Sequence, residues 1–162
     1  MLSTFQNPKN YGKIKNADAV GKAGNITCGD VMAIYIKIDH NKKGEPFIKD
    51  ISFETFGCVA AIATSSMITE LAKGKTLVNA LKITKSDIIQ KLDGLPKPKI
   101  HCSLLSTDAL FEAVYDYYSK NNPKLINEQM HEKHLHILAT QNKIEDMYPE
   151  WFKQESKKLK NK

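Results

Sequence analysis

The sequence contains no arginine: its 24 basic residues are all lysines, against 18 acidic residues, and the formal net charge is +6. Arginine supplies the two-pronged contacts that dominate specific recognition of phosphates and bases, so nothing in this composition points to a nucleic-acid partner. The chain also lacks any run of eighteen apolar residues, and its first residues do not have the basic and apolar segments of a secretory signal. We therefore expect a cytoplasmic protein with no membrane partner.

Cysteine is scarce as well. Cys28, Cys58 and Cys102 are too few, and odd in number, for a disulfide framework, and no C-x-x-C pair of the kind seen in zinc fingers or ferredoxins occurs. There is no Ser/His/Asp arrangement, phosphate-binding glycine loop or dinucleotide fingerprint, so a conventional enzyme is not indicated. The 162 residues are 41% hydrophobic and 26% charged, which is the composition of one soluble globular domain.

Alternating apolar residues predict two strands near the start of the chain. One covers residues 31–38, and the second covers about 48–56. The polar segment 39–46 between them contains glycine and proline, which favour a turn. The two strands are therefore predicted to form an antiparallel hairpin.

The apolar spacing then changes to that of helices. The first predicted helix begins at Val59 and ends at Gly74, and short helices follow Thr76 and Thr84, which can cap them. A longer helix is predicted over about 103–118, and the two prolines within 93–99 predict an extended or looped connection before it. Strands followed by helices indicate an α+β fold, with a small antiparallel sheet packed against several helices.

The last part of the chain is predicted to be a helical extension, which divides the protein into residues 1–125 and 126–162. Four apolar residues recur there every seven positions: Met130, Ile137, Ile144 and Trp151. Three histidines lie at positions that share no single helix face and are expected to be solvated: His131, His134 and His136. Trp151 is expected to pack back on the domain or to form a contact in a homo-oligomer.

The three cysteines lie at the edges of predicted elements. Cys28 precedes the first strand, Cys58 joins the second strand to a helix, and Cys102 begins a later helix, with Asp30 and His101 close by in sequence. A helix N-terminus favours the thiolate form, and thiolates combined with His or Asp suit zinc or an iron–sulfur cluster better than magnesium or calcium. If the fold brings these edges together, the five residues form a metal site. Otherwise the cysteines are small buried apolar residues.

Five motifs carry a resemblance to a known family: NPKNYG at 7–12, TCGDVM at 27–32, FETFGCVAAIATSS at 53–66, TELAKGKTL at 69–77 and KIHCS at 99–103. In order and separation they resemble the IscU/NifU family of iron–sulfur cluster assembly scaffolds, over about residues 5–119. The resemblance implies a SufE/NifU-like scaffold that assembles a transient [2Fe–2S] cluster and passes it to acceptor apo-proteins. It also implies a cysteine desulfurase as sulfur donor and an iron or electron donor protein.

The resemblance also assigns roles to the five residues. Cys28, Cys58 and Cys102 would be the cluster ligands and sulfur acceptors, and His101 would be the fourth ligand or its near neighbour. Asp30 would be an oxygen ligand that keeps the cluster labile. The same residues in the family can hold zinc.

Two positions depart from the family pattern. Val59 stands where a second glycine commonly follows the central cysteine. The loop at 95–99 reads Leu-Pro-Lys-Pro-Lys instead of the Leu-Pro-Pro-Val-Lys that IscU proteins present to an Hsp70-type chaperone, so chaperone-assisted release does not carry over. His101, and the lack of an insertion between Cys58 and Cys102, favour the IscU/NifU branch over SufU.

Two other functions use the same cysteines. A zinc-binding protein would hold its metal tightly and carry no sulfide. A sulfur-relay protein would carry a persulfide on one residue, for which we predict Cys102, because we expect an accessible thiolate at its helix N-terminus. The scaffold, which is not an enzyme, is the leading interpretation.

Overall fold

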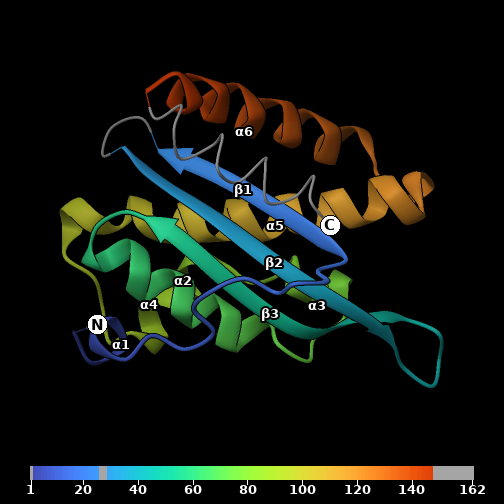
Figure 1. Ribbon diagram of the computed structural model, residues 1–162, viewed down its shortest axis with the longest axis horizontal. Helices are drawn as coiled ribbons and strands as arrows, with labels where there is room; N and C mark the ends of the chain where they lie inside the picture. The colour runs from blue at the N-terminus through green and yellow to red at the C-terminus, as the bar shows by residue number, and fades with distance from the viewer. Residues whose placement is uncertain (1, 26–28, 148–162) are drawn as a thin grey trace.

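The computed structural model describes residues 2–25 and 29–147, so Cys28 and Trp151 lie outside the described residues. Three strands form one antiparallel sheet in the order β1 (Ala19–Asn25), β2 (Asp30–His40), β3 (Pro46–Phe56). Figure 1 shows the three strands side by side, with the helix labelled α5 (His101–Asn121) behind them and α6 (Glu128–Met147) above them. The hairpin of β2 and β3 confirms the two predicted strands and the turn between them.

The strand β1 was not expected from its sequence, which is Ala-Val-Gly-Lys-Ala-Gly-Asn. It pairs with β2 along its whole length, from Ala19 opposite Ile36 to Asn25 opposite Asp30. The small residues allow α5 to pack closely against this strand. A Cβ on Gly21 would lie 2.1 Å from the Ala109 carbonyl oxygen and 2.1 Å from the Ala113 nitrogen. Glycine therefore lets the long helix α5 lie directly on the strand.

The described residues also form six α-helices and two 3₁₀ turns: α1 (Leu2–Gln6), α2 (Val59–Ala72), α3 (Leu77–Ala80), α4 (Lys85–Lys91), a 3₁₀ turn at Lys97–Lys99, α5 (His101–Asn121), a second 3₁₀ turn at Pro123–Leu125, and α6 (Glu128–Met147). Thr76 caps α3, and Thr84 forms a reciprocal capping box with Asp87 at the start of α4, as predicted. The connection over 93–99 is not wholly extended, because Lys97–Lys99 form a 3₁₀ turn, in which a proline is tolerated within the first turn.

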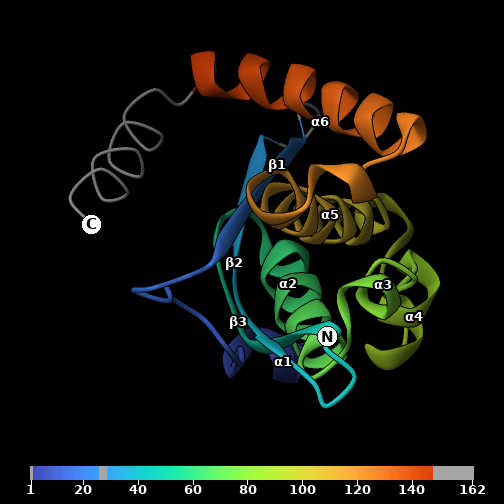
Figure 2. The ribbon, with the colours of Figure 1, turned by 90° about the vertical axis from the view of Figure 1, so that its right-hand side faces the viewer.

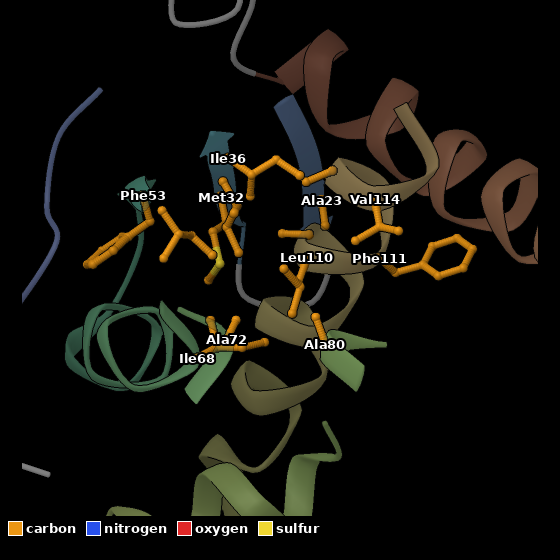
Figure 3. Close-up of a cluster of buried hydrophobic side chains, with 14 of the residues drawn as sticks. Ala23, Met32, Ile36, Phe53, Ile68, Ala72, Ala80, Leu110, Phe111 and Val114 are labelled. Atoms are coloured by element: carbon orange, nitrogen blue, oxygen red, sulfur yellow. The ribbon is translucent and has the colours of Figure 1, made fainter. Parts of the chain in front are cut away.

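The helices α2 and α5 cover one face of the sheet, and α3 and α4 lie beyond them (Figure 2). Side chains from β2, β3, α2 and α5 meet between these layers and form the core (Figure 3). Met32, Ile34 and Ile36, which alternate along β2, are all fully buried there. The fold is thus α+β, as predicted, with a sheet of three strands.

The C-terminal helix α6 packs along β1 and α5. Ile137 is buried and Met130 packs against the core, so the seven-residue spacing marks the inward face of α6 at these two positions. The expectation of solvated histidines is wrong for His134, which is half-buried, whereas His131 and His136 are exposed as expected. The Nδ1 atom of His134 lies 2.8 Å from the Glu112 carboxylate, and that of His131 lies 2.8 Å from the Tyr115 hydroxyl. None of the helices within the described ranges has the length and apolar character needed to cross a membrane.

Candidate metal centre

Four chain segments meet at one end of the sheet, where β3 ends and β2 begins. Cys58 is the N-cap of α2 and immediately follows the turn out of β3. Asp30 is the first residue of β2, and His101 and Cys102 are the first residues of α5. The antiparallel register places Val31 opposite Phe56, the last residue of β3. The start of β2 therefore lies beside the turn that leads to Cys58.

Three of the predicted site atoms form a compact triangle. The Cys58 sulfur lies 3.6 Å from the Cys102 sulfur and 3.4 Å from the Asp30 Oδ2 atom, and the Cys102 sulfur lies 3.7 Å from the same oxygen. A tetrahedral ion bonded to sulfur at ~2.3 Å and to oxygen at ~2.0 Å holds its ligands ~3.5 to 3.8 Å apart. The triangle therefore already has the edges that one tetrahedral metal ion requires.

His101 completes the arrangement as a nitrogen donor. Atoms from Asp30, His101 and Cys102 that can bind a metal all lie within 4.8 Å of one another. The Nε2 atom of His101 is buried and has no hydrogen-bond partner among residues 2–25 and 29–147. A buried polar atom without a partner is costly, and a bound metal would remove that cost.

The donor set is soft and asymmetric. Two sulfurs with one nitrogen and one carboxylate oxygen suit zinc or ferrous iron and are poor ligands for magnesium or calcium. Neither Cys58 nor Cys102 is in a disulfide, and their sulfurs lie well beyond the ~2.05 Å of an S–S bond. Both thiols thus remain able to bind metal or accept sulfur.

Gly57 fixes how closely the Cys58 turn approaches Asp30. A Cβ at Gly57 would lie 3.0 Å from the Asp30 Cγ atom and 2.9 Å from the Ala61 Cβ atom. These contacts are closer than ordinary van der Waals distance, so any side chain here would displace the carboxylate. The glycine before Cys58 is therefore part of the site.

Burial differs between the two described cysteines. Cys102 is 0% exposed, so the expectation that its thiol is solvent-accessible is wrong. Its sulfur lies 3.6 Å from that of Cys58, where the first turn of α5 contacts α2. Cys58 is half-buried and is the more accessible of the two.

Sequence reasoning missed Thr64. Its side chain is fully buried in α2, and its hydroxyl lies 3.2 Å from the carbonyl oxygen of Ala61 and 3.3 Å from that of Cys102, so its one proton is shared between the two. The contact with Cys102 ties the first turn of α5 to α2, two turns from Cys58. The available indication was the polar run Thr64-Ser65-Ser66 in a largely apolar helix, where a buried hydroxyl needs a partner.

Comparison with known proteins decides the family. The model of the NifU-like N terminal domain matches residues 1–124. The chain belongs to this family. This NifU-like domain ends before α6, so the match covers the sheet, α1 to α5 and all five predicted site residues, but not the C-terminal helix.

Proteins similar to this NifU-like chain have names that describe iron–sulfur cluster assembly scaffolds. The chain is 59% identical over 117 residues to the iron–sulfur cluster assembly scaffold protein IscU 1 of Archaeoglobus fulgidus, covering 72% of this chain and 73% of the relative. It is 45% identical over 120 residues to the IscU scaffold protein of Aquifex aeolicus, covering 74% of each chain. A crystal structure described as a SUF-system iron–sulfur cluster assembly scaffold from Fervidobacterium islandicum superposes with a TM-score of 0.57 at 28% identity, over 70% of this chain and 92% of that chain.

Proposed function

We propose that this protein is a scaffold on which a [2Fe–2S] cluster is assembled from iron and sulfur and then passed to acceptor apo-proteins. The observation that supports it most directly is the triangle of Asp30, Cys58 and Cys102 donor atoms, with edges of 3.4 to 3.7 Å, beside the buried Nε2 of His101, which has no partner among the described residues. Cys28 is proposed as the further thiolate ligand. The family relatives named as scaffold proteins support the same role.

The mixed donors explain why a cluster here would be transferable. Four thiolates in a closed cage hold iron tightly, whereas a carboxylate oxygen is a harder and weaker ligand for an iron–sulfur cluster. We propose that Asp30 competes for iron with a thiolate and keeps the cluster labile. His101 is the alternative fourth ligand, and its buried Nε2 lies in the same group of donor atoms.

Sulfur would enter through Cys58 and Cys102. In the proposed step, an acceptor thiolate attacks the outer sulfur of a desulfurase persulfide, forming a new persulfide and releasing the donor thiolate. Cys102 is retained as the acceptor candidate, but its burial means that a donor reaches it past Cys58, whose sulfur is 3.6 Å away. An electron donor then supplies the two electrons that convert the persulfide into sulfide and thiol.

The proposal has further parts that follow from the family. The protein would work in the cytoplasm, with a cysteine desulfurase, an iron or electron donor protein and acceptor apo-proteins as partners, and would catalyse no reaction itself. Residues 1–125 would form the scaffold domain and 126–162 an extension to it. The same donor set would hold zinc when no cluster is present.

Anaerobic reconstitution tests the proposal. The purified protein is incubated with ferrous iron, cysteine and a cysteine desulfurase, and the visible spectrum and acid-labile sulfide are measured. We expect near-equal iron and sulfide, a chromophore that weakens in C28A, C58A and C102A, and transfer to an apo-ferredoxin. Tightly bound zinc with no chromophore would support the zinc protein instead, and a persulfide on Cys102 without a cluster would support the sulfur relay.

The role of Asp30 has its own test. We expect Asp30→Ala to slow transfer of the reconstituted cluster to apo-ferredoxin while leaving cluster formation in place. Asp39→Ala is the matched control, because Asp39 is an exposed carboxylate near the other end of the same strand. Equal transfer rates for the two variants would remove Asp30 from the proposed mechanism.

A further inference from the structure

A groove lies far from the metal centre, between the end of α2 and the helices α3 and α4. This groove has a volume of about 390 Å³. Its floor contains the partly buried apolar side chains of Leu71 and Ile83, and its rim carries Lys75, Lys82 and Lys91. Thirteen residues of α2 separate Leu71 from Cys58, which corresponds to ~20 Å along the helix.

The lysines of the groove make few contacts within the described part of the chain, and Lys75 acts on the Asp87 carboxylate through its charge alone. Within residues 2–25 and 29–147, neither Lys75, Lys82 nor Lys91 forms an ion pair or a side-chain hydrogen bond, although other lysines such as Lys73 and Lys133 do. The one acid in the groove is Asp87, whose carboxylate accepts hydrogen bonds from the backbone nitrogen and hydroxyl of Thr84. Three lysines against one already engaged carboxylate leave a positive rim.

An exposed apolar residue lies next to a groove residue in the sequence, although it is not part of the lining itself. Val78, in the short helix α3 beside the groove residue Asn79, is 58% exposed. An apolar strip with a basic rim is the shape and charge that complement an amphipathic helix with leucine or isoleucine on one face and Asp or Glu beside it. A small inorganic anion would use the lysines but leave the apolar strip uncovered.

We infer that this groove is a docking surface for an acidic amphipathic helix of a partner protein. Nucleic acid is a poorer fit, because no arginine is present and no aromatic side chain lines the groove for base stacking. The contact is small and its charges are exposed, so it is a transient and salt-sensitive interaction. Its distance from the metal centre lets a partner remain bound while the cysteines are engaged.

The inference is tested with a fluorescent synthetic peptide that has leucines at helical spacing and glutamates elsewhere, by anisotropy titration of the full-length protein. We expect K75E/K82E/K91E to weaken binding by about tenfold or more, and V78S to weaken it less. The control K42E/K43E/K49E makes the same change in net charge on exposed lysines in and beside the β2–β3 turn. It should change binding by less than about twofold.

Several results would overturn the inference. They are equal weakening by the control variant, binding of polyglutamate or single-stranded DNA as tight as that of the peptide, and amide NMR shifts that map away from Leu71 and Ile83. The charge-reversed variant should still reconstitute its chromophore. The docking surface and the proposed scaffold function can therefore fail independently.

Discussion

The contact between α5 and α6 predicts a specific dependence of stability on pH. Glu112 on α5 is 8% exposed, and its carboxylate lies 2.8 Å from the Nδ1 atom of His134 on α6. Burial, and then the neighbouring carboxylates of Asp108 and Asp116, raise the pKa of Glu112 from 4.5 to about 8, while Lys133 acts in the opposite direction. Burial also lowers the pKa of His134. Near neutral pH the folded pair therefore holds one proton.

The unfolded chain releases that proton at a lower pH. Its glutamate titrates near 4.5 and its histidine near 6.5. Below about 6.5 the raised pKa of Glu112 and the lowered pKa of His134 offset each other in part, because they change the proton balance in opposite directions. Between about pH 6.5 and about pH 8, Glu112 is protonated in the folded state, whereas neither group is protonated in the unfolded chain. The free energy of unfolding therefore falls as the pH rises through this range. At ~1.4 kcal/mol per pH unit, this window is worth ~2 kcal/mol.

The assay is thermal unfolding followed by circular dichroism between about pH 6 and 8.5. A loss of ~2 kcal/mol lowers the melting temperature of a domain of this size by ~4 to 8 °C. Glu112→Gln keeps the shape of the side chain but cannot hold the proton, so we expect it to flatten this decline. Glu132→Gln, at an exposed position on α6, is the matched control and should retain it.

Two results would refute this reasoning. One is a melting temperature that stays constant from pH 6 to 8.5 in the unmodified protein. The other is a decline of the same size in Glu112→Gln, which would place the titrating group elsewhere.

Three further predictions concern particular positions. Gly57→Ala should weaken zinc binding by about tenfold without unfolding the protein, because the new Cβ would push against Asp30. Zinc affinity is measured by competition with a chelator, and an affinity equal to that of the unmodified protein would contradict this prediction. Gly21→Ala should lower the free energy of unfolding by ~3 kcal/mol or more, because the backbone of α5 cannot move away from the new Cβ; urea titration measures it, and a loss below ~1 kcal/mol would argue against the close contact. In a C28A background, a thiol-alkylating reagent should modify Cys58 about tenfold faster than Cys102, because Cys102 is fully buried. Mass spectrometry of quenched samples gives both modification rates. In urea, which unfolds the protein, the two rates should become equal.

Local sequence was sufficient for most of the helices and for the hairpin. The capping residues Thr76 and Thr84 act within three residues of themselves, so their helix starts could be placed without knowing the rest of the fold. The β-branched apolar run of β2 likewise indicates a strand, and this strand is buried on both faces from Asp30 to Ile36. The strand β1 could not be found in this way. Its alanines and glycines are needed because only small residues leave room for α5, which begins about eighty residues later in the sequence.

The sequence by itself determined the chemistry of the candidate centre: the thiols, the carboxylate and the imidazole at element edges, in motifs that place the chain in its family. Only the tertiary structure decided their relation in space. Cys58 and Cys102 are 44 positions apart, and their sulfurs meet because α2 and α5 begin at the same end of the sheet. The same packing buries Cys102, and the separate packing of α6 on α5 pairs His134 with Glu112. These are long-range contacts, whose geometry depends on how the layers close and is therefore not written in any local pattern.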